Sequence, residues 1–211
     1  MDFENNQEIL KWLPRLKKFL SQIIDDFEID KDGEYKEELI SDENIKKHWT
    51  KVFIHPSFGQ ITGFESYEFI GDKLSGYVFS KLMMLKYRDK FDEELGTDLN
   101  EEYMSENFQS MVVSKYGFDK IILKDPSTKL NKKQLGDIFE AFVGGLSTIG
   151  DSIIMFPIGS IFVYNFMNSL FKKEPVDLTT LKSNPIRRLN LLYSYNSLGK
   201  IDYKQSRSDN P

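Results

Sequence analysis

The sequence predicts an all-α fold, and three observations support this prediction. Apolar residues recur at helical spacing in several long segments. No segment before residue 200 alternates apolar and polar residues over any length, as a half-buried strand would. Two of the most apolar helices contain glycines, although each glycine costs a helix about 1 kcal/mol relative to alanine. Such glycines indicate close packing of another backbone, so we expect helices that cross at short distance.

The first expected helix covers residues 6–28, where Pro14 either kinks the helix or begins a second one. The next covers residues 42–54, with Ser41 or Asp42 able to cap it. It ends at HPSF, residues 55–58, because the residue before a proline disfavours helical backbone. These two helices form the predicted N-terminal part of the fold.

A long helix is expected from residue 65 to residue 87, with Gly71 and Gly76 inside it. Five of its apolar residues are spaced for burial: Phe69, Tyr77, Val78, Leu82 and Leu85. The acidic segment FDEELGTD, residues 91–98, is expected to be a loop. Further helices are expected over residues 99–116, 136–150 and 158–173, with a turn at residues 125–127.

Composition limits the chemistry. The 211 residues include 33 acidic side chains, two histidines and no cysteine, so thiolate chemistry is excluded and a histidine-rich site has little material. A net charge of −5 argues against a polyanionic partner, unless bound cations change the sign of an acidic site. No segment has the roughly 18 uncharged apolar residues of a membrane span, and no signal peptide is recognised. We expect an intracellular, soluble protein, with cytoplasm and nucleus not distinguished.

Two short motifs place carboxylates on helix faces. In ESYEFIGD, Glu68 and Asp72 are four residues apart and share a face, with Glu65 about one turn earlier. In GDIFEAF, Asp137 and Glu140 are three residues apart and also share a face. Each pair alone reads as an ordinary solvated helix face. Both pairs, however, lie among large apolar residues, where an unpaired carboxylate is costly to bury, and oxygen ligands suit Mg²⁺ or Mn²⁺.

The two motifs together resemble the ribonuclease III family. Its signature helix reads approximately E-x-x-E-F-L-G-D, and this chain has Glu65, Glu68, Phe69, Ile70, Gly71 and Asp72 in that spacing. Its second motif reads D-x-x-E-A followed by small residues, and this chain has Asp137, Glu140, Ala141, Gly144 and Gly145. HPSF is similar to the H-x-S motif that precedes the signature, and Lys133, four residues before Asp137, matches the Dicer-like branch.

The resemblance implies a ribonuclease III-type endonuclease domain that acts as a homodimer on double-stranded RNA. It implies that Glu68, Asp72, Asp137 and Glu140 bind Mg²⁺, with Mn²⁺ as a substitute, and that Asp72 and Glu140 are catalytic. Water activated by two cations would then hydrolyse the phosphodiester bond and leave 5′-phosphate and 3′-hydroxyl ends. No histidine base is required. The alternative is a catalytically weak or inactive relative that binds RNA or protein through the same fold.

Three further residues take roles from the resemblance, each with a simpler alternative, and a fourth, His55, takes a structural one. Glu65 would lie near the substrate, or it stabilises the start of its helix. Lys133 would neutralise a phosphate or a metal ligand, or it is a solvated lysine. Phe69 would enter a pocket of the partner subunit, or it belongs to the core. His55 is expected to hold the turn before the signature helix rather than to catalyse.

The chain departs from the family pattern in two places. The family carries an RNA-holding arginine after the signature helix, but Asn100 occupies its place here, with Glu101, Glu102 and Glu106 nearby. The tail resembles only the opening helix and first strand of a double-stranded-RNA-binding domain, in which Arg187 and Arg188 would contact RNA. The tail is either a piece of a longer protein or a decayed module, and we expect it to pack on the body or to be poorly ordered.

These inferences divide the chain into four parts. They are an N-terminal helical extension (1–44), a ribonuclease III-like endonuclease domain (45–173), a linker (174–183) and a short, incomplete α/β fragment resembling a double-stranded-RNA-binding domain (184–211).

Overall fold

The computed structural model describes residues 6–59, 63–153 and 155–178, together with residues 181, 189, 192 and 193. Within these residues the secondary structure is helical, and the one β feature is an isolated parallel bridge between Ile54 and Leu123. The predicted all-α fold is confirmed. No helix among the described residues is long and apolar enough to cross a membrane.

The N-terminal helix α1 (Gln7–Asp26) is continuous through Pro14. Asn6 caps it, because its side chain accepts hydrogen bonds from the backbone N–H groups of Glu8 and Ile9. One face of α1 is buried, and the indole of Trp12 donates a hydrogen bond of 2.6 Å to the carbonyl of Ile121. The helix is therefore anchored to the body by both apolar packing and a buried hydrogen bond.

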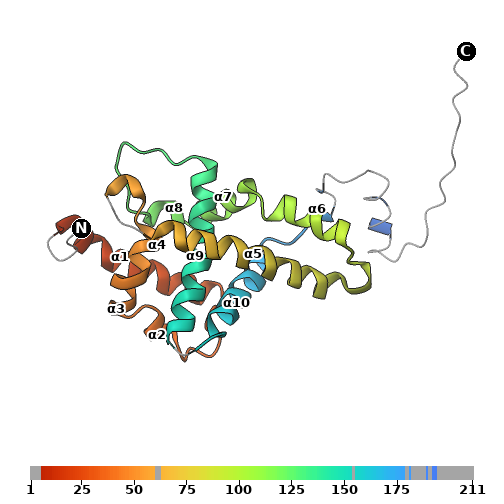
Figure 1. The fold of residues 1–211 in the computed structure, drawn as a ribbon, viewed down its shortest axis with the longest axis horizontal. Coiled ribbons are helices and arrows are strands. Elements are labelled where there is room, and N and C mark those ends of the chain that lie inside the picture. Colours follow the sequence, from red (N-terminus) through yellow and green to blue (C-terminus); the bar gives the residue numbers. More distant parts are fainter. Residues whose placement is uncertain are drawn as a thin grey trace, which may run out of the picture.

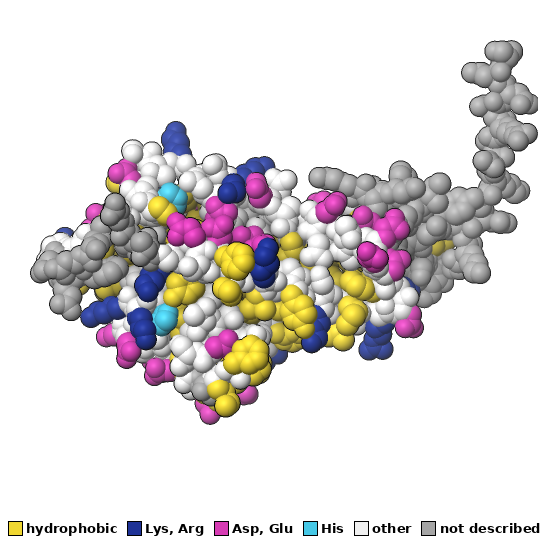
Figure 2. Space-filling model, viewed as in Figure 1, with side chains coloured by type: hydrophobic (Ala, Val, Ile, Leu, Met, Phe, Trp, Pro, Cys, Tyr) yellow, Lys and Arg dark blue, Asp and Glu magenta, His cyan; other side chains and the backbone are white. Residues whose placement is uncertain are grey.

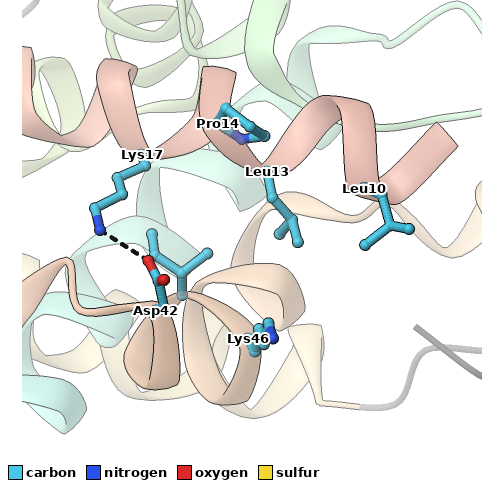
Figure 3. A pocket seen from close by; sticks show the side chains of 7 residues that line it. Leu10, Leu13, Pro14, Lys17, Asp42 and Lys46 are labelled. Carbon is cyan, nitrogen blue, oxygen red and sulfur yellow. Dashed lines mark hydrogen bonds and ion pairs between the residues drawn. The ribbon is translucent and has the colours of Figure 1, made fainter. Parts of the chain in front are cut away.

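The helix expected over residues 42–54 is divided. It consists of α3 (Asp42–Asn44), a π-helical turn η1 (Ile45–Trp49) and α4 (Thr50–Phe53), and it follows the short α2 (Lys36–Leu39). Ser41 caps α3 by accepting a hydrogen bond of 3.2 Å from the backbone of Asn44. Lys17 of α1 and Asp42 of α3 form an ion pair of 2.8 Å across a shallow pocket between these elements (Figure 3).

Three long helices make the centre of the fold. Helix α9 (Lys132–Ile153) crosses α5 (Phe64–Tyr87) steeply near the N-terminal half of α5, and α10 (Ile158–Lys173) packs on both (Figure 1). A capping box begins α9: the backbone N–H of Gln134 donates to the side chain of Asn131, and the side chain of Gln134 accepts from the backbone of Asn131. The position of the α5–α9 crossing decides which side chains meet.

The segment after α5 corrects one prediction. Residues 91–98 were expected to form a loop, but α6 (Glu93–Tyr103) begins there because the Asp92 side chain caps it, with a hydrogen bond of 2.8 Å from the backbone of Leu95. The helix expected over residues 99–116 is interrupted, and α7 (Glu106–Lys115) begins after Ser105. The remaining elements are α8 (Phe118–Ile121) and the short 3₁₀ turns η2 (Pro56–Phe58) and η3 (Arg88–Lys90).

One apolar face of α5 is not part of the core. The periodicity predicted burial of Phe69, Tyr77 and Leu85, but their exposed fractions are 63%, 61% and 52%. Val78 and Leu82 are buried as expected. Figure 2 shows hydrophobic side chains following α5 on the surface, beside a group of acidic side chains over the α5–α9 crossing. The prediction was wrong for these three residues because helical spacing does not distinguish a core face from a face open to a partner.

The segment after α10 packs on the body as far as it is described. The Glu174 carboxylate pairs with Lys115 and Tyr116, and Leu178 and Leu181 are buried. Apart from residues 189, 192 and 193, the predicted fragment 184–211, including Arg187 and Arg188, lies outside the described residues. The division of the chain into four parts stays a prediction.

Candidate metal centre

Two glycines allow α5 and α9 to approach at backbone distance. A Cβ atom at Gly71 would lie 1.7 Å from the carbonyl oxygen of Glu140, and one at Gly144 would lie 1.9 Å from that of Tyr67. No larger side chain fits at either position without moving a helix. The close crossing brings the two acidic motifs together, because Glu68 and Asp72 flank Gly71 while Glu140 precedes Gly144 by one turn.

Three carboxylates converge at this crossing. Oxygen atoms of Glu68, Asp137 and Glu140 all lie within 4.8 Å of one another, and each side chain is half-buried. The fourth predicted ligand, Asp72, stands outside this group: it is exposed, and its Oδ2 accepts a hydrogen bond of 2.6 Å from the ammonium of Lys73. Asp72 nonetheless lies near enough for its charge to act on both Glu68 and Glu140.

The carboxylates perturb one another. Burial raises the pKa of Glu140, the hydrogen bond from Gln109 lowers it, and the negative charges of Asp72, Asp137 and Glu68 raise it, which together bring it to about 7. Burial also raises the pKa of Glu68, with Asp137 adding to the effect. These shifts show that negative charge is crowded into a partly desolvated site.

Burial and neighbouring charges also shift the pKa of the Asp137 carboxyl on α9. Burial raises its pKa, the positive charge of Lys133 lowers it, and Glu106 raises it. The site therefore has an all-oxygen donor set, raised pKa values and too little positive charge nearby to balance its acids. This combination fits a hard divalent cation such as Mg²⁺, which prefers oxygen ligands and would relieve the repulsion.

The remaining predicted residues surround the cluster. Glu65 is exposed in the first turn of α5, and Lys133 is exposed in the first turn of α9, near enough to lower the pKa values of Glu68 and Asp137. Phe69 points to solvent beside the ammonium of Lys73, which lies 5.7 Å from its ring centre. The geometry thus separates an acidic side and an apolar side on the same stretch of α5.

His55 has a positioning role. Its Nδ1 atom accepts a hydrogen bond of 3.1 Å from the backbone of Ser57 and lies 2.8 Å from the Ser57 hydroxyl, which closes the turn η2 before α5. Its Nε2 atom lies 3.2 Å from the side-chain amide of Gln134 at the start of α9. His55 therefore links the turn before one acidic helix to the beginning of the other.

Sequence reasoning missed Gln109. This side chain of α7 is buried, and its Nε2 atom donates a hydrogen bond of 3.0 Å to Oε1 of Glu140. The two residues are 31 positions apart in the chain, so no helical spacing connects them. Glu106, on the same helix, was noted only for its acidity near Asn100, and its influence on Asp137 was also missed.

Asn100, which takes the place of the family's arginine, faces the protein. Its Nδ2 atom donates to the hydroxyl of Ser80 on α5 at 2.9 Å and to the carbonyl of Gly96 at 2.8 Å. The side chain is half-buried and joins α6 to α5. In this conformation its donors are used within the protein.

The carboxylate cluster at the helix crossing of this all-α fold has the oxygen donors that a divalent cation prefers. Residues 65–148 match the family profile of the Ribonuclease III domain, and this segment contains all four predicted carboxylates. Residues 65–148 are therefore similar to the ribonuclease III domain, which supports the resemblance drawn from the two motifs. Domains of this family are double-stranded-RNA endonuclease domains that generally use divalent cations and typically dimerise. No curated protein matches the chain.

Proposed function

We propose that this protein is a Mg²⁺-dependent endoribonuclease that hydrolyses double-stranded RNA, with Mn²⁺ as a substitute cation. The observation that carries the proposal is the convergence of Glu68, Asp137 and Glu140, whose oxygens lie within 4.8 Å of one another inside the ribonuclease III domain. Asp72 completes the ligand set by leaving Lys73 for the site. Its exposure and its position one turn after Glu68 support this role.

Glu68, Asp72, Asp137 and Glu140 would hold a pair of cations, which would supply an activated water and stabilise the leaving oxygen, so that the products would carry 5′-phosphate and 3′-hydroxyl ends. The protein's contribution would be to hold three half-buried carboxylates together with the exposed Asp72 beside them, and we assign the catalytic roles to Asp72 and Glu140. Lys133 lies beside the cluster, where an ammonium would meet an RNA phosphate. We assign substrate contacts to Glu65 and Lys133, and also to Arg187 and Arg188 of the tail.

The proposal includes a homodimer with two such sites. Phe69 is 63% exposed on the apolar face of α5, and an apolar pocket lies farther along the same helix. That pocket is lined by Tyr77, Ser80, Lys81, Met84 and Phe91. A two-fold dimer would allow the Phe69 of each subunit to enter the other's pocket, because such interfaces are self-complementary. Phe69→Asp should therefore yield monomers by light scattering, while Phe156→Asp, at a phenylalanine that is 78% exposed and lies outside α5, is the control.

Cleavage of long duplex RNA in Mg²⁺ tests the proposed site. Glu140→Ala and Asp72→Ala should each lower the rate on the order of 10³-fold, as loss of a group acting directly on the reacting atoms does. Glu37→Ala, which removes an exposed acid on α2, is the matched control and should cut like the wild type. Wild-type rates in both site variants would show that the site is wrongly assigned.

A second candidate function is favoured by Asn100. Because its amide is bonded to Ser80 and Gly96, the arginine contact of the family is absent at this position. The protein would then be a catalytically weak or inactive subunit that binds RNA or a protein partner. Retention of duplex RNA without product in either Mg²⁺ or Mn²⁺ would favour this function over cleavage.

A further inference from the structure

Gln109 is placed to hold Glu140 from outside the carboxylate cluster. It comes from α7, which packs against α9, and its side chain is only 3% exposed. Its Nε2 atom donates to Oε1 of Glu140 at 3.0 Å. When Glu140 is ionised, as a cation ligand must be, its carboxylate accepts hydrogen bonds but donates none, so the amide nitrogen of Gln109 is the group that suits it.

The other end of the amide is confined by Gly136. This glycine lies on α9 one turn before Glu140, and a Cβ atom there would come within 2.9 Å of the Gln109 Oε1 atom. Gly136 therefore makes the space in which the amide oxygen sits. The Gln109 side chain spans two positions on one face of α9 and has little freedom to turn away from the carboxylate.

The chemistry of an amide suits this task. A lysine or arginine at position 109 would also donate to Glu140, but its charge would compete with a cation for the carboxylate. A neutral amide orients the carboxylate and leaves its charge available. Carboxylates that bind metals are commonly held in this way by hydrogen bonds from a neighbouring residue.

We infer that Gln109 is a positioning residue that holds the Glu140 carboxylate for a divalent cation. The inference rests on the proposed function, in which Glu140 is a ligand. It assigns a role to a residue outside both acidic motifs, and it gives Gly136 a purpose that helix geometry alone does not require.

Mn²⁺ titration by calorimetry, without RNA, tests the inference. Gln109→Leu removes the donor and puts an apolar side chain of similar size in its place, and it should weaken Mn²⁺ binding on the order of tenfold. Gly136→Ala should weaken binding in the same direction, because the new methyl group displaces the amide oxygen while position 109 is unchanged. Gln22→Leu is the matched control, since this glutamine also donates to a carboxylate, that of Asp26, but lies on α1 outside the cluster.

The dependence of the cleavage rate on Mg²⁺ concentration distinguishes a positioning role of Gln109 from a purely structural one. If Gln109 positions a ligand, the Mg²⁺ concentration for half-maximal cleavage rises in Gln109→Leu, and saturating Mg²⁺ restores most of the rate. Mn²⁺ affinity within twofold of the wild type in both Gln109→Leu and Gly136→Ala would overturn the inference, even where Gln109→Leu proves unstable. In that case the proposed function stands if Glu140→Ala abolishes Mn²⁺ binding, and it fails together with the inference if the wild type binds none.

Discussion

Two helix crossings in this fold use the same device and differ in what surrounds it. At the α5–α9 crossing, Gly71 and Gly144 place each helix against the backbone of the other. At the α9–α10 crossing, Gly150 and Gly159 do the same: a Cβ atom at Gly159 would lie 1.9 Å from the carbonyl oxygen of Ser147. Both crossings are buried, and both would be disrupted by a single methyl group.

Among the described residues, only the first crossing is bordered by several converging carboxylates, those of Glu68, Asp137 and Glu140. At the second crossing a single carboxylate, that of Asp151, accepts a hydrogen bond of 2.8 Å from the backbone N–H of Gly159. A glycine pair in a helix crossing therefore indicates close packing of two helices and does not by itself indicate a cation-binding site. The acids at spacings of three and four residues distinguish the crossing that could bind a cation.

The largest expected effects come from filling the glycine positions. Gly71→Ala and Gly159→Ala should each lower the free energy of unfolding by about 3 kcal/mol, since the methyl group meets backbone that cannot move without shifting a helix. Only Gly71→Ala should also weaken Mn²⁺ binding, because it displaces the backbone that carries Glu140. Urea unfolding and Mn²⁺ titration, at a temperature where both variants remain folded, measure the two effects.

Two results would contradict the expected difference in Mn²⁺ affinity between Gly71→Ala and Gly159→Ala. Equal loss of Mn²⁺ affinity in both variants would mean that destabilisation alone impairs the site. Unchanged affinity in Gly71→Ala would mean that the crossing does not set the ligand geometry.

An intermediate effect is expected from the charge crowded at the first crossing. Burial and the neighbouring acids together raise the pKa of Glu140 from 4.5 to about 7, so the stability associated with the neutral carboxyl is present below pH 4.5 and is lost as the pH rises through 7. Glu140→Gln cannot ionise and should therefore be more stable than the wild type above pH 7. Because Glu140 is half-exposed, solvent screening reduces the expected gain to about 1.5 kcal/mol.

Unfolding curves between pH 4 and pH 8 in a chelating buffer measure this gain. Added Mg²⁺ should stabilise the wild type more than Glu140→Gln, because a ligand that binds the folded state raises its stability. A difference between the two proteins that does not vary with pH would show that Glu140 is not the titrating group.

Much of this crossing could be predicted from the sequence, because its determinants are local. Helical spacing indicates which acids share a face, and Gly71 indicates a close neighbour, before any tertiary contact is known. The identity of that neighbour and the hydrogen bond from Gln109 depend on how α7 and α9 pack, which no local pattern encodes.

Other features were misread because different structures share one local pattern. Phe69, Tyr77 and Leu85 have the spacing of a core face but lie at the surface. The acidic residues 91–98 have the composition of a loop, but with an aspartate cap they begin a helix, where acids favour the helix dipole. In both cases the tertiary surroundings, and not the pattern, decide the outcome.

The smallest expected effect comes from Gly76, a glycine of α5 that lies at neither crossing. Gly76 was expected to pack closely against another backbone, but a Cβ atom there would meet only the side-chain oxygen of Asn100, at 3.9 Å. This is an ordinary van der Waals distance, so Gly76→Ala should be accommodated and should stabilise α5 by about 0.5–1 kcal/mol through helix propensity. Urea unfolding of Gly76→Ala and Gly71→Ala compares the same substitution at two positions that are five residues apart on one helix. The free energy of unfolding should rise in Gly76→Ala and fall in Gly71→Ala. Destabilisation at both positions would show that α5 is packed tightly along its length. Close packing would then not be specific to Gly71 at the carboxylate crossing.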